Sequence, residues 1–356
     1  MNILFLCGRE ADYPLNRFLI ESMRQFASVN VLDENGSGSS ILKRSLRVFS
    51  KALPELLVNH YDLIFVSFYG HFLMLPFSFL HRKKVVFHPF ISTYETLVFD
   101  RQKFSAQSLP AKLAFWLDRS ACHNASHILL DTQANIDFFS TSFSIPHERF
   151  SKILIGSDER IFFPRPVTRD DNNVVVLYHG SYLPLHGIDV IIQAAHILND
   201  QPDILFRMVG RGPGYEHISS LTEKLNLKNI EFLESVPFEK LPYTIAGADI
   251  CLGGHFGSSD KAARVIAGKT FQDIAMGKPT IVGDTIANRE LLKHGYDAWF
   301  SKPNDPVSLA NGIIALAKEP TLRILLGQNA HETFLKKASL KALVPEIIAL
   351  LERVVG

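Results

Sequence analysis

Short apolar segments alternate with longer segments of helical periodicity along this chain, and the alternation occurs in both halves. The apolar segments of the first half lie at residues 3–7, 29–32, 63–68, 85–90 and 127–130. The helical patterns between them lie at residues 16–26, 41–58 and 110–125. Strands that are separated by helices form parallel sheets with crossover connections. The first half is therefore predicted to be a doubly wound α/β domain.

The second half repeats this pattern after a linker that ends in two prolines near residue 166. Its apolar segments lie at residues 174–178, 204–209, 230–233, 250–252 and 280–282. Their nearly continuous apolar character favours a sheet that is covered on both faces. We predict domains at residues 1–165 and 166–335, and a final helical segment at 336–356 that crosses back to the first domain. Two such domains leave a cleft, with ligands at the carboxyl ends of the strands.

Composition excludes several classes of protein and places the chain in the cytoplasm. The 356 residues allow two domains of roughly 150 residues each, and the formal net charge of +1 argues against a nucleic-acid partner. The three cysteines are far apart and fit a reducing compartment. The uncharged segment 63–80 is interrupted by Gly70 and Pro76, so a strand, a turn and a short helix are expected rather than a membrane span.

Two glycine-containing segments follow apolar strands of the second half. In the first, a strand ends at Gly180 and a helix begins near Gly187. Glycine lets a phosphate approach the backbone, and the helix N-terminus offers free N–H groups. The second segment, with Gly210 and Gly212, also stands between a strand and a helix, but it is not a full dinucleotide-binding motif. Ordinary turns between strand and helix are the alternative interpretation of both.

Three cations, Lys261, Arg264 and Lys269, precede or open a helix that ends at Gly277. Positive charge beside a helix N-terminus does nothing for the helix, so an anionic ligand is expected there. The alternative is a solvated basic loop, because most charge clusters are simply surface.

In the first half, His88 and Asp100 lie on a loop that follows a strand. Loops carry function disproportionately, and histidine can accept a proton near neutral pH. Both are candidate catalytic residues, while an ordinary surface or hydrogen-bonded histidine is the alternative interpretation of His88.

Together these segments resemble glycosyltransferase family 4, the retaining enzymes of the GT-B fold. The resemblance runs from the loop at Gly8, through Gly-Ser-Asp at 156–158 and Val-Gly-Arg-Gly-Pro at 209–213, to Ala-Met-Gly-Lys-Pro at 275–279. The strongest matches are Ala-Gly-Ala-Asp-Ile at 246–250 and the segment 271–281. The resemblance implies two Rossmann-like domains that face each other across a cleft, an acceptor site in the first domain and a nucleotide-sugar site in the second.

Four positions depart from the pattern of that family. Ser181 and His186 stand where the family has an arginine and a lysine that bind the diphosphate. Arg264 and Gln272 stand where the family has glutamates that hold the donor sugar and the ribose. Arg264 and Lys269 are expected to meet the phosphate charge instead. The predicted nucleotide-sugar-binding residues are Gly8, Gly180, Ser181, His186, Gly210, Gly212, Arg264, Lys269 and Gln272.

The resemblance implies an enzyme that moves a hexose from a nucleotide diphosphate sugar to a saccharide or lipid-linked acceptor in cell-envelope polysaccharide or glycolipid synthesis. It implies retention of configuration, no metal and no cofactor besides the donor, with catalysis mostly by positioning and electrostatic stabilisation. A non-catalytic nucleotide-sugar-binding subunit of the same fold is the main alternative. The lost lysine and glutamate positions favour the subunit, whereas His88, Asp100 and the three cations favour the enzyme. An epimerase of the same fold is a third hypothesis, with no distinguishing feature in the sequence.

The helical segment 41–58 predicts peripheral contact with the inner face of a membrane. Apolar side chains gather near one helical face, at Ile41, Leu42, Leu46, Phe49 and Leu53. Basic side chains fall mostly on the other face, at Lys43, Arg44, Arg47 and Lys51, and residues 81–84 add further basic charge. Such a helix can lie in the interface of an anionic bilayer. The alternative is an ordinary amphipathic helix whose apolar face covers the sheet.

Overall fold

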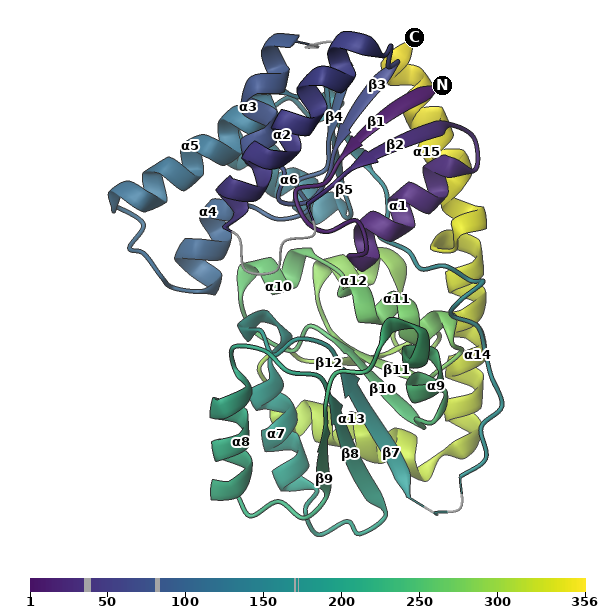
Figure 1. Ribbon diagram of the computed structural model, residues 1–356. Coiled ribbons are helices and arrows are strands. Elements are labelled where there is room, and N and C mark those ends of the chain that lie inside the picture. The colour runs from purple at the N-terminus through teal and green to yellow at the C-terminus, as the bar shows by residue number, and fades with distance from the viewer. Residues whose placement is uncertain (35–39, 81–83, 170, 172) are drawn as a thin grey trace. The chain divides into compact units, whose positions relative to one another are not determined.

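A computed structural model describes residues 1–34, 40–80, 84–169, 171 and 173–356, without the side chains of residues 77–80 (Figure 1). The chain forms two compact units. Unit 1 comprises Met1–Ile155 together with Leu340–Gly356, and unit 2 comprises Gly156–Ser339. The first division thus lies at Gly156, ahead of the proline-containing linker at which the sequence placed the boundary.

Unit 1 contains a six-stranded sheet in the order β2-β1-β3-β4-β5-β6, in which all neighbours are parallel. Its strands are β1 (Asn2–Leu6), β2 (Ser28–Leu32), β3 (Leu63–Val66), β4 (Val85–Phe87), β5 (His127–Leu130) and β6 (Phe150–Lys152). Its longer helices are α1 (Pro14–Arg24), α2 (Ile41–Val58), α3 (His71–Leu80), α5 (Leu109–Asn124), α6 (Gln133–Phe143) and α15 (Leu340–Val355). A short helix α4 (Thr93–Glu95) continues into a π-helical turn (Thr96–Asp100).

Helices cover the first sheet because successive strand side chains alternate between its faces. Leu4 and Leu6 of β1 pack in one core cluster with residues of α2, α3, α5 and α6. Phe5, between them, is fully buried and stacks on Phe65 of β3 at a ring distance of 5.0 Å. The C-terminal helix α15 packs on α1, and Arg353 in it donates a hydrogen bond to Ser151 of β6 at 3.0 Å. The end of the chain is therefore part of unit 1.

Unit 2 contains a second parallel sheet of six strands, in the order β12-β11-β10-β7-β8-β9. Its strands are β7 (Val174–His179), β8 (Ile204–Val209), β9 (Ile230–Leu233), β10 (Ile250–Gly254), β11 (Thr280–Gly283) and β12 (Trp299–Ser301). Its helices are α7 (Ile188–Ile197), α8 (Tyr215–Lys224), α9 (Leu241–Ala246), α10 (Asp260–Arg264), α11 (Gly268–Ala275), α12 (Ile286–Leu291), α13 (Pro306–Lys318) and α14 (Pro320–Lys337). Strand and helix alternate as in unit 1, which confirms the predicted α/β class with parallel sheets.

The uncharged segment 63–80 forms β3, a turn and α3, as the sequence predicts. Among the described helices, none combines the length and the apolar character that crossing a bilayer requires.

Candidate functional site

Two glycine loops meet at the carboxyl edge of the second sheet. Gly180 follows β7 with φ of 133°, and Gly210 follows β8 with φ of 120°. The Gly180 N–H donates to the carbonyl of Val209 at 3.0 Å, and a methyl group added at Gly210 would lie 2.3 Å from the Gly180 oxygen. Only glycine fits this backbone contact. The structure therefore brings the predicted residues Gly180 and Gly210 together, at the edge where ligands bind in such sheets.

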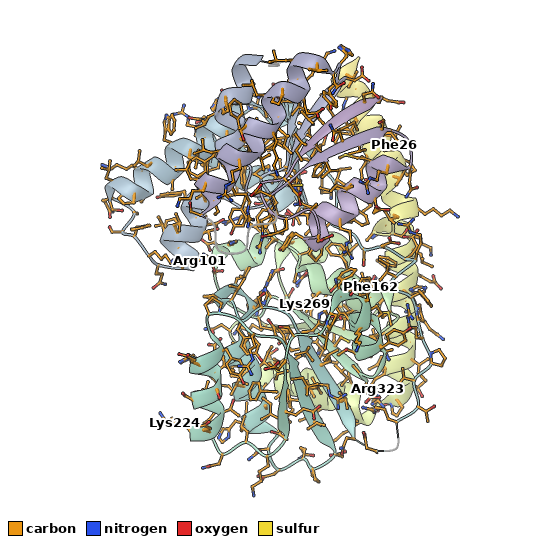
Figure 2. All side chains as sticks on the ribbon, viewed as in Figure 1. Phe26, Arg101, Phe162, Lys224, Lys269 and Arg323 are labelled. Atoms are coloured by element: carbon orange, nitrogen blue, oxygen red, sulfur yellow. The ribbon has the colours of Figure 1, made fainter. Side chains whose placement is uncertain are left out.

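Four basic side chains lie beside these loops and are called the basic cluster here: His186, His255, Lys261 and Lys269. Lys269, labelled in Figure 2, opens the first turn of α11, and its Nζ lies 3.2 Å from Nδ1 of His186. The rings of His186 and His255 are 5.1 Å apart. A methyl group at Gly180 would lie 3.2 Å from Lys269 Cε, so the cluster adjoins the first glycine loop.

Tyr178, fully buried in β7, fixes the geometry of the cluster. Its hydroxyl donates to the carbonyl of Ser181 at 2.8 Å and lies 2.6 Å from Nδ1 of His186. The ammonium of Lys269 lies 4.8 Å from the centre of the same ring, within range of a cation–π contact. One tyrosine thus orients the loop after Gly180, the predicted residue His186 and the lysine.

Burial makes the positive charges of this cluster costly. Burial lowers the pKa of Lys269 to about 7, although the nearby carboxylate of Asp273 acts in the opposite direction. The pKa values of His186 and His255 lie well below the usual value, first because of burial and then because of Lys269. Asp273 is itself engaged by Nε2 of His179 at 2.8 Å. An anion placed here would stabilise the charged form of the lysine.

His255 adds a second indication of a ligand. It follows β10, is 3% exposed, and its Nδ1 is buried without a hydrogen-bond partner in the described part of the chain. Buried polar atoms in native proteins are nearly always satisfied, so this nitrogen is suited to a hydrogen bond with a bound ligand.

The other predicted residues of unit 2 lie on elements that follow strands of the same sheet. Arg264 ends α10 and Gln272 lies in α11, and both are half-buried. Gly212 lies in the turn after β8, where a methyl group would lie 2.6 Å from the nitrogen of Tyr182. This glycine is therefore required by backbone packing, whatever it binds.

Gly8, His88 and Asp100 belong to unit 1. A methyl group at Gly8 would lie 2.2 Å from the nitrogen of Gly70, so this glycine serves the contact between two loops. His88 directly follows β4 and is 2% exposed; its Nδ1 has no hydrogen-bond partner among the described residues, and burial lowers its pKa to about 3. Asp100 is half-buried at the end of the π-helical turn. The catalytic roles of His88 and Asp100 remain predictions.

Sequence reasoning missed Tyr178 and His255. Tyr178 looked like one more member of an apolar strand, and its hydroxyl becomes informative only beside His186. A signal did exist for His255, because it follows a glycine pair at the end of a predicted strand, where ligands bind in parallel sheets.

Residues 159–333 match the family model of glycosyl transferases group 1. The uncharacterized glycosyltransferase MJ1178 of Methanocaldococcus jannaschii is 27% identical over 163 residues, which cover 46% of this chain and 43% of that protein. The putative colanic acid biosynthesis glycosyl transferase WcaI of Escherichia coli K12 is 24% identical over 152 residues, or 39% and 36% of the two chains. The chain thus spans less than half the length of these relatives.

Solved structures resemble the whole chain. Sucrose-phosphate synthase from Thermosynechococcus elongatus has a TM-score of 0.79 at 15% identity, over 99% of both chains. Anabaena Alr3699/HepE in complex with UDP has a TM-score of 0.76 at 18% identity, over 99% of this chain and all of that one. At such identities the likeness concerns the fold. The chain has the GT-B fold, and nearly all of its second unit matches the glycosyl transferases group 1.

Proposed function

We propose that this protein is a glycosyltransferase that moves a sugar from a nucleotide diphosphate sugar to an acceptor hydroxyl. The observation that carries the proposal is the basic cluster at the carboxyl edge of the second sheet, within the segment that matches the family model. The complexes of Alr3699/HepE with UDP and with UDP-glucose support a nucleotide-sugar donor, since that protein has a similar fold.

The donor diphosphate would lie against the backbone of Gly180 and Ser181, with Lys269 as the main cation. Ser181 and His186 lack the fixed charges that the family has at these positions. Lys269 would supply the positive charge that these two positions lack, because its ammonium lies beside the ring of His186. Backbone N–H groups and a buried ammonium aimed at a departing diphosphate stabilise the charge that develops as the glycosidic bond breaks.

The remaining features of the reaction are proposed on the resemblance to family 4. These are retention at the anomeric carbon, independence of metal, and an acceptor held by unit 1 near His88 and Asp100. Because the imidazole of His88 is neutral, it is better suited to form a hydrogen bond with an acceptor hydroxyl than to carry a positive charge. The hexose type of the sugar and a role in cell-envelope polysaccharide synthesis belong to the same proposal.

A non-catalytic nucleotide-sugar-binding subunit is the second candidate function. The specific observation that favours it is the pair Arg264 and Gln272 at the positions of the two family glutamates. Binding of UDP, GDP or ADP together with turnover of the matching sugar donor supports an enzyme. Binding with no hydrolysis and no transfer to any acceptor supports the subunit.

We further propose that α2 of unit 1 attaches the protein to an anionic membrane surface. Of its predicted apolar face only Phe49 packs against the core: Leu42 and Leu46 are 47% and 60% exposed, and Ile41 and Leu53 are exposed as well. The buried residues of α2 are instead Arg44, Ser45, Val48 and Ala52. The side of the helix that packs on the core is therefore of mixed polarity. Phe49 and Leu56 also contact the core, while most of the other large apolar side chains face outward.

Another helix of unit 1 also exposes apolar side chains. α3 contacts both α2 and α5 (Figure 1). α5 exposes Leu109, Leu113 and Trp116. Lys43, Arg47 and Lys51 are exposed, although Arg47 and Lys51 form ion pairs with Glu34 at 3.0 Å and 2.8 Å. Arg44, expected on the basic face, is instead buried, with an ion pair to Glu10 at 2.7 Å. Most of the basic segment 81–84 lies outside the described residues.

A further inference from the structure

The basic cluster brings several basic groups close together where they are buried. Lys269, His255 and Lys261 are 7%, 3% and 7% exposed, and Lys269 Nζ lies 3.2 Å from His186. Two positive charges at such a short distance repel each other strongly when water is largely excluded from the site. Without a bound anion, burial favours neutral histidines and loss of a proton from Lys269 near neutral pH.

The carboxylate of Asp273 acts against the cost of a positive charge on Lys269. Asp273, one turn further along α11, faces Lys269, but its Oδ1 accepts a hydrogen bond from His179 of β7. The hydroxyl of Tyr178 in β7 is neutral, since burial raises its pKa well above the usual range. Lys261 of α10 adds positive charge, which lowers the pKa values of both histidines. Burial nevertheless lowers the pKa of Lys269 to about 7, so Asp273 does not by itself keep this lysine charged.

A diphosphate brings negative charge to Lys269 and also a partner for His255. Phosphate oxygens are strong acceptors, and the buried Nδ1 of His255 lacks a partner in the described chain. The site also adjoins Gly180, whose missing side chain leaves the backbone approachable beside Lys269. We therefore expect a bound anion to stabilise the protonated form of Lys269, and the protonated lysine to strengthen binding of the anion.

We propose that donor binding is coupled to uptake of a proton: Lys269 becomes an ammonium as the diphosphate enters, while His255 donates a hydrogen bond to a phosphate oxygen. This rests on the proposed function, because it assigns the donor diphosphate to the basic cluster.

The coupling has a definite sign. In the empty site the pKa of Lys269 is about 7, and a bound anion raises it. Affinity is then fully present below pH 7 and falls as the pH rises through this value, by up to about tenfold per pH unit for one proton. The terminal phosphate of a nucleoside diphosphate ionises near pH 6, so it contributes little to the change above pH 7.

The test is titration calorimetry of the full chain with UDP, GDP and ADP between pH 7 and pH 9, in buffers of different ionisation enthalpy. We expect uptake of close to one proton at pH 8 and a roughly tenfold weaker affinity at pH 8.5 than at pH 7.5. Lys269→Arg, which keeps its charge at every pH used, should bind without proton uptake and with a flat pH profile. His255→Gln should bind more weakly at every pH with the same slope. Lys224→Arg, on the exposed helix α8, is the matched control and should behave as the wild type.

The outcomes separate this inference from the function on which it rests. Binding that is independent of pH and buffer in the wild type overturns the proton coupling while leaving the nucleotide site intact. A slope that persists in a folded Lys269→Arg variant overturns the assignment to Lys269. If none of the three nucleotides binds at pH 7, the proposed donor site fails and the inference fails with it. The wild-type measurement decides the coupling even if a variant does not fold.

Discussion

At the scale of single residues, the role of a side chain in the site depends on the residues that it contacts. The sequence pointed to Lys269 and Arg264 as cations without a structural purpose, and the structure gives Lys269 a purpose through Tyr178 and His186. The sequence could not reveal that Tyr178 ties the loop to the histidine, because this contact depends on how β7 ends.

Arg264→Ala should weaken binding of a nucleoside diphosphate about tenfold or more. A charge-assisted hydrogen bond to phosphate contributes about 1.5–3 kcal/mol. Calorimetry with UDP, GDP and ADP measures the effect, with Lys224→Ala as the control for loss of a cation remote from the site. Unchanged affinity in Arg264→Ala would exclude this residue from the donor site.

Tyr178→Phe should lower the free energy of unfolding by about 1–3 kcal/mol, because it removes the hydrogen bonds of the Tyr178 hydroxyl to the Ser181 carbonyl and to His186. Tyr182→Phe is a matched control: Tyr182 is 1% exposed, and its hydroxyl has no hydrogen-bond partner among the described residues. That variant should be neutral or stabilising. Urea denaturation compares the two, and equal effects would contradict the role given to the Tyr178 hydroxyl.

At the scale of elements, helices and strands with a strong periodic pattern were predicted correctly. The shortest helices were missed. The helix at 41–58 and the strands at 127–130, 204–209 and 230–233 have the predicted bounds. α10 and α12 have five and six residues, too few for a periodic pattern. α13 was missed although Asp305 caps it and Pro306 opens it, a recognisable start signal. The outward direction of the apolar face of α2 could not be predicted, because periodicity does not say which face is buried.

The double variant Leu46→Glu/Leu53→Glu should lose binding to anionic vesicles at low salt. Both side chains are exposed, so the changes remove apolar contact with lipid and add negative charge without opening the core. Leu325→Glu, at a half-exposed position of α14, is the control and should still bind. Co-sedimentation with vesicles that contain phosphatidylserine measures this. No binding by the wild type, or equal binding by the double variant, would refute the membrane role of α2.

At the scale of the whole molecule, the repeated strand–helix pattern predicted two parallel α/β units, and the structure confirms them. The position of the last helix within unit 1 depends on its packing against α1, which no local pattern specifies. Both units contain buried histidines, so both are expected to lose stability at acid pH.

The protein should lose stability as the pH falls below about 6.5. His88 is neutral in the fold, with a pKa of about 3, whereas an unfolded histidine takes up a proton near pH 6.5. Stability from a lowered pKa is present above the unfolded value and declines below it, here by about 1.4 kcal/mol per pH unit for each such residue. His88→Gln should therefore show a shallower decline between pH 6.5 and pH 4.5 in urea denaturation. The exposed His217→Gln serves as control, and an identical slope in His88→Gln would contradict the burial of a neutral imidazole.

The central claim is that the second unit binds a nucleotide sugar and that the protein transfers its sugar. Incubation of the full chain with UDP-, GDP- and ADP-glucose, followed by measurement of released nucleoside diphosphate, tests it most directly. We expect release from one of these donors, reduced at least tenfold in Lys269→Met and unchanged in Lys224→Met. Release that is equally fast in Lys269→Met would contradict the site, and a wild-type protein that neither binds nor cleaves any donor would contradict the function.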